Sequence, residues 1–358
     1  MKTKQPKQRN NPSQKPSAID LFCGCGGMTE GLKQAGYNVL WGIDLAPSPL
    51  MSYKANHPEV LVNEGDIRQV DCKKTMQTLG LKKGDLDLLS GCPPCQGFSS
   101  IRTHNGRYSI GDDRNDLIGD YLRFVESFRP KAVMLENVPG LKDNWRFHNF
   151  IESMSAMGYR GEWKVLNVAN YGVPQRRKRL IYIAAYKKNI SIADRKYEKR
   201  TVRDAISDLP PAGKSGDFMH DFPEKRTDKI KRMIALIPRD GGSRSQLPEE
   251  YILPCHKRNP AGFKDVYGRM AWDKPSPTIT GGCSSPSKGR FLHPEENRCI
   301  TLREAALLQG FPRNYIFPSG VAKDSLALMV GNALPVSFIY AHAKEIKQQM
   351  KKWKAKHG

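Results

Sequence analysis

The chain has 358 residues, 39% of them hydrophobic, which is enough apolar material for one large core or two smaller ones. Its net charge of +22 at pH 7 favours nucleic acid as partner over anionic lipid. The sequence shows no apolar signal segment and no apolar run of membrane-spanning length, so we expect a soluble cytoplasmic protein without a membrane partner. Its eight cysteines are unevenly scattered, which does not suggest a disulfide framework.

Basic residues gather at both ends of the chain. Residues 1–17 contain five Lys and Arg residues and no acidic residue, and residues 344–358 contain six Lys residues against one Glu. We interpret residues 1–17 as a flexible basic arm. Such ends add sequence-independent affinity for phosphates.

From residue 17 onward, short apolar runs alternate with amphipathic segments. This alternation predicts a doubly wound, mostly parallel sheet of the α/β class. In the second predicted helix, Ser48 is the expected cap and Pro49 lies in the first turn. The predicted strands are residues 18–22, 38–44, 86–91, 131–137 and 179–186, and the predicted helices are residues 28–36, 48–57, 116–130 and 145–159.

Beyond about residue 187 the regular alternation ends. The sequence becomes rich in charged residues, Pro and Gly, which indicates a smaller, irregular second domain built largely from loops. A helix returns at residues 301–312, where Thr301 and Glu304 form the pattern of a capping box. A long helix then closes the chain.

The stretch DLFCGCGG, residues 20–27, joins a predicted strand to a predicted helix through glycines. This layout lets the backbone approach a nucleotide-like ligand, although the spacing departs from the dinucleotide fingerprint and a plain tight turn is an alternative. Asp44 and Asp66 follow the next two strands, where carboxylates can meet ribose hydroxyls and an adenine amino group. Together these features indicate an adenosine-bearing cofactor at the carboxyl edge of the sheet.

The stretch GCPPCQGFSS, residues 91–100, poses a question of chemistry. A redox pair would need a helix start after Cys95, and the Gly, Phe and Ser residues there make a poor one. A zinc site needs about four ligands, and the nearby Cys23 and Cys25 belong to the glycine turn. We therefore expect no metal. The Pro pair stiffens the loop, which suits a single nucleophile, with Cys95 the better candidate.

A nucleophile needs partners, and two later segments offer them. Glu136 ends a buried strand, where partial desolvation raises a carboxyl pKa and lets the group donate or share a proton, although a helix-capping Glu is an alternative. Arg177 and Arg179 alternate at the entrance to a strand, so they fall on one face. Two guanidinium groups there can hold a carbonyl oxygen and a phosphate, although an isolated basic run is more often a solvated edge.

The order of these segments resembles the signature blocks of the DNA (cytosine-5) methyltransferases of bacterial or phage type. The matching blocks run from residue 18 to about residue 343 and are DLFCGCGGMTEG, GCPPCQGFSS, LENVPGL, YGVPQRRKRL, TLREAALLQGFP and GNALPVSF. The resemblance implies S-adenosyl-L-methionine as methyl donor and a cytosine of double-stranded DNA as substrate. Because the reacting ring is hidden in a duplex, the base must flip out.

The resemblance also implies roles for individual residues. Cys95 would add to carbon 6 of the ring, Glu136 would bond N3 and the amino group, Arg179 would hold the ring carbonyl and Arg177 would support the pocket. Methyl transfer to carbon 5 and elimination of the thiolate follow. Gln96 and Ser99 match the loop that closes over DNA. The implied cofactor-binding residues are Phe22, Gly24, Gly26, Asp44, Leu45, Asp66, Pro94 and Asn332.

The implied domains are a catalytic cofactor-binding domain, residues 18–186 plus 325–358, and a target-recognition domain, residues 187–324. Within the latter, residues 187–269 hold 19 Lys and Arg residues against 12 Asp and Glu residues, which fits a phosphate-contacting surface. Cys25 and Cys92 stand where the family often has Ala or Gly, and we expect both substitutions to be mild.

Two other readings share parts of this pattern. One branch of the family methylates a transfer RNA, and the long variable segment favours DNA over that substrate. A catalytically inactive relative that only binds DNA is the second, and the presence of Cys95, Glu136 and Arg179 argues against it. We expect a nucleoid-associated monomer. Pairing with a restriction endonuclease fits the sequence, as does a solitary or phage-borne role.

Overall fold

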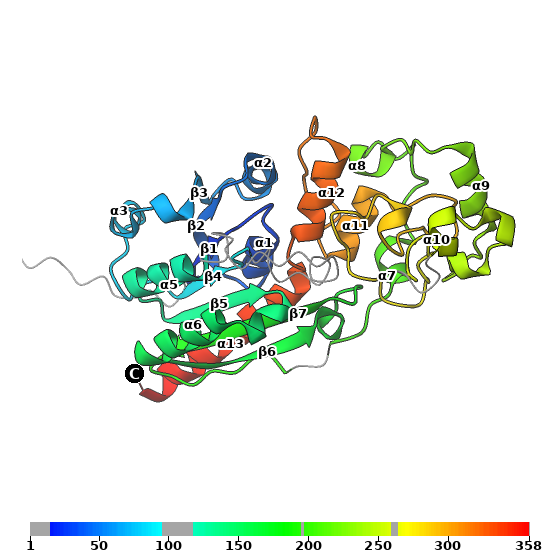
Figure 1. Ribbon diagram of the computed structural model, residues 1–358. Helices are drawn as coiled ribbons and strands as arrows, with labels where there is room; N and C mark the ends of the chain where they lie inside the picture. The colour runs from blue at the N-terminus through cyan, green and yellow to red at the C-terminus, as the bar shows by residue number, and fades with distance from the viewer. Residues whose placement is uncertain (1–14, 95–116, 195–196, 259–263, 358) are drawn as a thin grey trace, which may run out of the picture.

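The computed structural model describes residues 15–94, 117–194, 197–258 and 264–357, and its centre is a seven-stranded sheet (Figure 1). The strand order is β3-β2-β1-β4-β5-β7-β6. The strands are β1 (Ser17–Leu21), β2 (Asn38–Asp44), β3 (Leu61–Glu64), β4 (Leu88–Gly91), β5 (Ala132–Asn137), β6 (Tyr159–Asn167) and β7 (Lys178–Tyr186).

Strand direction confirms the predicted mostly parallel α/β sheet. Strands β1 to β5 pair in parallel, whereas β7 runs antiparallel to both β5 and β6. The sequence analysis missed β6. Most of its side chains are exposed or only partly buried, so this edge strand lacks the continuous apolar run that marks the inner strands.

Helices cover both faces of the sheet because successive residues of each strand point to opposite sides. One face packs on α1 (Gly27–Gln34), α2 (Pro47–Asn56) and α13 (Val336–His357). The other packs on α3 (Cys72–Thr78), α5 (Leu117–Phe128) and α6 (Trp145–Ala156). The pair Ala18 and Ile19 illustrates the alternation, since Ala18 belongs to the first core and Ile19 to the second.

Two helix starts test the predicted caps. The expected cap of α2 at Ser48 is wrong, because the helix begins at Pro47 and its cap is Ala46, two residues before Ser48. A proline is favoured at this first position, where its missing N–H costs no helical hydrogen bond. The capping box at Thr301 and Glu304 is confirmed at the start of α11 (Leu302–Leu308).

Short helices and loops form a second unit at one end of the molecule (Figure 1). Its helices are α7 (Val202–Ile206), α8 (Phe218–Asp221), α9 (Asp228–Leu236), α10 (Pro254–Arg258), α11 and α12 (Lys323–Asn332). The guanidinium of Arg269, fully buried, donates to four backbone carbonyls and to the Asn297 side chain. It thereby joins the end of α9 to the loop around residues 293–297.

One helical stretch among the described residues, Lys323–Lys352, has the length and apolar composition of a membrane span. Most of it is buried inside the protein, as in the core helix of a globular fold, so it is weak evidence of a span.

Candidate active site

The sheet reverses its winding between β1 and β4. The chain runs outward from β1 through β2 to β3, then returns to place β4 on the other side of β1. In open α/β sheets, ligands bind beyond the carboxyl ends of the strands at such a point. Backbone hydrogen bonds join the strand ends here, from Cys92 N to Leu21 O at 3.2 Å and from Cys23 N to Ile43 O at 2.9 Å.

The glycine turn after β1 depends on backbone conformations that side chains disfavour. Gly24 has φ +51° and Gly26 has φ +95°. A Cβ at Gly26 would lie 2.5 Å from the Tyr315 hydroxyl, so this position also has no room for a side chain. A Cβ at Gly24 would meet no atom within 4 Å. The predicted residue Phe22 precedes the turn, with φ +61° and a partly buried ring.

Asp44 links the glycine turn to the end of β2. One carboxylate oxygen accepts the Gly24 N–H at 2.8 Å and the other accepts the Ala46 N–H at 2.9 Å. Burial raises the pKa of this carboxyl, and the backbone donors oppose that shift. Leu45, next in the chain, leaves 67% of its surface exposed. The structure thus brings the predicted residues Gly24, Asp44 and Leu45 together.

Asp66, after β3, has a local partner that the sequence analysis did not anticipate. Its carboxylate pairs with Arg68 at 2.5 Å and caps the short helix that begins at Ile67. The hydrogen bonds from Arg68 lower the pKa of Asp66. The carboxylate is therefore ionised at neutral pH and held at the edge of the sheet.

The joint between α12 and α13 packs against the glycine turn. The Tyr315 hydroxyl donates to Cys25 O at 2.7 Å, and a Cβ at Gly27 would lie 2.6 Å from Leu334 O. Asn332, predicted to touch the cofactor, is exposed at this joint. Segments about 300 residues apart in sequence therefore meet at one turn, and Tyr315 is a contributor that the sequence analysis missed.

This edge of the sheet fits S-adenosylmethionine by its carboxylate acceptor, its apolar surface and its open space. The backbone at Gly24 has free volume where any side chain would stand, so a ligand can approach the main chain. The Asp44 carboxylate retains lone pairs for hydroxyl groups. The exposed Leu45 side chain offers an apolar surface next to it.

The Pro-Pro loop begins where β4 ends. Asn137, buried at the end of β5, donates from Nδ2 to Pro93 O at 2.9 Å and thereby fixes the start of this loop. The sequence analysis gave Asn137 no role. Pro94 is exposed and is the last described residue before Cys95. The predicted residues Cys95, Gln96 and Ser99 lie outside the described residues.

Glu136 occupies the centre of a polar cluster at the end of β5, with 1% of its surface exposed. Gly91 pairs with Leu135, so Cys92 follows opposite Glu136, and its thiol donates to Glu136 Oε2 at 2.8 Å. Arg179 lies on β7, two residues from Ile181, the partner of Glu136, and therefore on the same face of the sheet as Glu136. Its Nε is 2.9 Å from Glu136 Oε1. The alignment of this ion pair leaves Oε1 without a hydrogen bond from the described residues.

Burial decides the protonation of this carboxyl more than its partners do. Desolvation raises the pKa of Glu136, and Arg179, the Cys92 hydrogen bond and Arg177 oppose that rise. The balance keeps the pKa above the ordinary value for Glu. A raised pKa favours the protonated form of this carboxyl, which can donate or share a proton, as the sequence analysis expected.

Arg177 supports this cluster from the loop that precedes β7. Its Nη1 donates to Ile279 O and to Gly331 O, both at 2.9 Å, and its Nε has no partner among the described residues. Burial and the nearby Arg179 lower the pKa of Arg177 to about 9, so it remains charged at pH 7. Arg177 therefore ties β7 to the second unit and adds positive charge behind Glu136 and Arg179.

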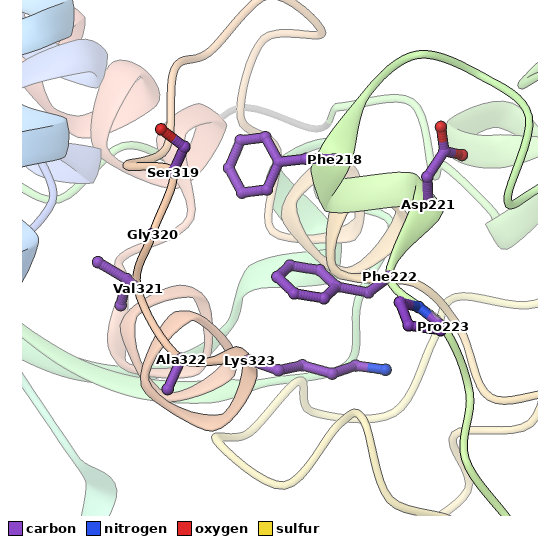
Figure 2. A pocket seen from close by; sticks show the side chains of 9 residues that line it. All are labelled: Phe218, Asp221, Phe222, Pro223, Ser319, Gly320, Val321, Ala322 and Lys323. Carbon is purple, nitrogen blue, oxygen red and sulfur yellow. The ribbon is translucent and has the colours of Figure 1, made fainter.

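A separate pocket of about 660 Å³ lies in the second unit, between α8 and the turn before α12 (Figure 2). Phe218 and Phe222 point toward the turn at residues 319–322, and the Lys323 side chain runs beside Phe222. None of the lining residues was predicted from the sequence. The pocket contains no nucleophile next to an acid, and it is not part of the cluster around Glu136.

Comparison with known proteins identifies the family. The profile described as C-5 cytosine-specific DNA methylase matches residues 17–348. The type II methylase M.HgiDII of Herpetosiphon aurantiacus is 37% identical over 345 residues, which cover 93% of this chain and 95% of the relative. The type II methyltransferase M1.BsuMI of Bacillus subtilis is 33% identical, over 90% of this chain and 78% of the relative.

Solved structures share the fold at lower sequence identity. A prophage-encoded DNA modification methyltransferase of E. coli superposes with a TM-score of 0.69 at 23% identity, over 94% of this chain and 100% of its own. The Entamoeba histolytica methyltransferase EhMeth gives 0.66 at 15% identity, over 94% and 99%. With its matching sequence and sheet, the chain belongs to the C-5 cytosine-specific DNA methylase family and is a DNA (cytosine-5-)-methyltransferase, EC 2.1.1.37.

Proposed function

We propose that this enzyme methylates a flipped-out cytosine within a specific sequence of double-stranded DNA through a covalent adduct with Cys95. The observation that carries the proposal is the cluster of buried Glu136 and Arg177 with partly buried Arg179, beside the end of β4 at the point where the sheet reverses its winding. The Pro-Pro loop that leads to Cys95 starts at this cluster, fixed by Asn137.

The chemistry follows from the charges of these groups. The Cys95 thiolate adds to carbon 6 of the ring and forms a carbon–sulfur bond, while the protonated Glu136 carboxyl gives hydrogen-bonding support at N3, so the ring accepts the electron pair without full negative charge. Arg179 holds the ring carbonyl, and Arg177 supports the pocket from behind. Once carbon 5 carries the methyl group, a base removes the carbon 5 proton. The electron pair of that C–H bond then forms the double bond between carbons 5 and 6, and the carbon 6–sulfur bond breaks and releases the Cys95 thiolate.

S-adenosylmethionine, when bound, supplies the electrophilic methyl group that carbon 5 receives. The residues that would hold it lie at or near the carboxyl ends of β1, β2, β3 and β4, and they are Gly24, Asp44 and Leu45, with Phe22, Gly26, Asp66, Pro94 and Asn332. Support comes from the open space at Gly24 and the Asp44 carboxylate beside it.

The partners follow from charge and from the family. The net charge of +22 suits a duplex, and residues 187–324 would contact the target sequence, with Gln96 and Ser99 in the loop over the DNA. We infer a cytoplasmic monomer, associated with the nucleoid through DNA and paired with a restriction endonuclease, as the type II names of its relatives suggest.

Transfer of tritium from labelled S-adenosylmethionine tests this proposal. Wild-type protein should label duplex DNA and not transfer RNA, and bisulfite sequencing of DNA from expressing cells should show methylated cytosines in one sequence motif. Cys95→Ser should lose at least about 10³-fold in rate, since a serine hydroxyl is a far weaker nucleophile than a thiolate. A Cys95→Ser protein with the wild-type rate would exclude the covalent mechanism, and label in transfer RNA alone would exclude DNA as substrate.

A further inference from the structure

Cys92 is a polar neighbour of Glu136 at a position where, by the resemblance, the family often has Ala or Gly. Its Sγ lies 2.8 Å from Glu136 Oε2. Burial and the Glu136 charge raise the pKa of this thiol well above its ordinary value, so it keeps its proton and acts as the donor. The substitution is therefore not a neutral one, because it adds a hydrogen bond to the central carboxyl of the site.

The two oxygens of Glu136 consequently have different surroundings. Oε2 accepts the thiol hydrogen, whereas Oε1 has the Arg179 ion pair and no hydrogen bond from the described residues. In the protonated carboxyl the two oxygens differ, because one carries the hydrogen and the other only accepts hydrogen bonds. The thiol donates to Oε2 and therefore favours the form in which Oε1 carries the hydrogen and can donate it.

We propose that Cys92 is a positioning residue for methylation, whose thiol fixes the Glu136 carboxyl so that Oε1 is left to meet the substrate ring. This inference rests on the proposed role of Glu136. Three groups face the carboxyl from the packed elements: Cys92 beyond β4, Arg179 on β7 and Arg177 before β7. Of these, only Cys92 donates a hydrogen bond to Oε2 among the described residues.

If Cys92 positions Glu136, its removal should change the pH dependence of kcat, which the loss of a purely packing side chain would not do. The thiol hydrogen bond stabilises the ionised carboxylate, so its removal raises the Glu136 pKa further. Because Glu136 acts in its protonated form, activity falls as pH rises through its pKa. In Cys92→Ala, the alkaline limb of kcat should move to higher pH by about half to one unit, and kcat at its optimum should fall about fivefold to tenfold.

Two variants serve as matched controls. Cys92→Ser keeps a donor of similar size and should restore both kcat and the position of the alkaline limb. Cys283→Ala removes a buried thiol in the core of the second unit, outside the cluster around Glu136, and should leave the pH profile unchanged. Melting temperatures of all variants check that each is folded.

An infrared measurement reads the contact without activity. The difference spectrum of wild type minus Cys92→Ser isolates the S–H stretching band of Cys92, which a hydrogen bond to a carboxylate lowers in frequency. In a Glu136→Gln background, this band should move to higher frequency, because a neutral amide oxygen is a weaker acceptor than a carboxylate. A band that does not move would overturn the inference.

The outcomes separate this inference from the proposed function. If Glu136→Gln keeps the wild-type kcat, the assignment of Glu136 itself is wrong. If Glu136→Gln is inactive while Cys92→Ala keeps the wild-type kcat and alkaline limb, only the role of Cys92 fails. If Cys92→Ser behaves like Cys92→Ala, the donor is not the cause and the positioning role fails as well.

Discussion

Replacing Gly26 by Ala should destabilise the fold severely, because two constraints act at this residue. Its φ of +95° is a conformation that L-residues rarely adopt, and the new Cβ would lie 2.5 Å from Tyr315 Oη and 2.7 Å from His57 Nε2. These two side chains are buried and hydrogen-bonded to each other at 3.1 Å, and Tyr315 also donates to Cys25 O. Neither can retreat without losing a buried hydrogen bond.

The magnitude follows from these two terms. Backbone strain of about 1–3 kcal/mol and overpacking of about 1–3 kcal/mol together predict that the free energy of unfolding falls by roughly 2–6 kcal/mol. Gly24→Ala is the matched control, since its φ is +51° and its Cβ would meet nothing within 4 Å. It should cost only about 1–2 kcal/mol of stability. Its methyl group would instead fill the space through which the cofactor reaches the backbone.

Urea denaturation followed by circular dichroism measures the first effect, and calorimetric titration with S-adenosylmethionine measures the second. Gly26→Ala should lower the unfolding midpoint steeply. Gly24→Ala should remain folded and lose at least about tenfold in cofactor affinity, which corresponds to about 1.4 kcal/mol. A Gly26→Ala protein within about 1 kcal/mol of wild type would refute the steric argument. Wild-type affinity in Gly24→Ala would refute the assignment of the cofactor site.

Three further predictions concern buried polar groups. Asn137→Ala removes the hydrogen bond to Pro93 O and should lower kcat about tenfold, with a smaller effect on KM for DNA. An unchanged kcat would mean that this hydrogen bond does not position the Pro-Pro loop. Arg269→Met leaves the buried oxygens that accept hydrogen bonds from the guanidinium without a donor, so it should lower the free energy of unfolding by at least about 3 kcal/mol. A urea unfolding midpoint equal to that of the wild type would contradict this prediction. Burial raises the pKa of Asp20 to about 7, so the stability that its protonated form supports is present below about pH 4 and is lost as pH rises to about 7. Relative to Asp20→Asn, the wild-type free energy of unfolding should fall by roughly 1.4 kcal/mol per pH unit in that window, and parallel pH curves for the two proteins would contradict the assignment.

The inner strands and the glycine turn could be predicted from the sequence because their signals are local. A fully buried strand such as β5 reads as a continuous apolar run, and a turn at positive φ selects glycine. The edge strand β6 gave no such signal, since most of its side chains are exposed or only partly buried and polar residues interrupt its apolar ones. Which neighbour a strand pairs with, and in which direction, depends on segments distant in the chain, so the antiparallel β7 was beyond a local pattern.

The site divides in the same way. The motifs and their order along the chain were enough to identify the family and to select Glu136, Arg177 and Arg179 as candidate site residues. Only the tertiary structure decided that the Cys92 thiol meets Glu136 and that Asn137 meets Pro93, each pair 44 residues apart in sequence. The physical reason is register. The pairing of β4 with β5 sets which side chains face one another, and a shift of one residue would turn every one of them to the opposite face of the sheet.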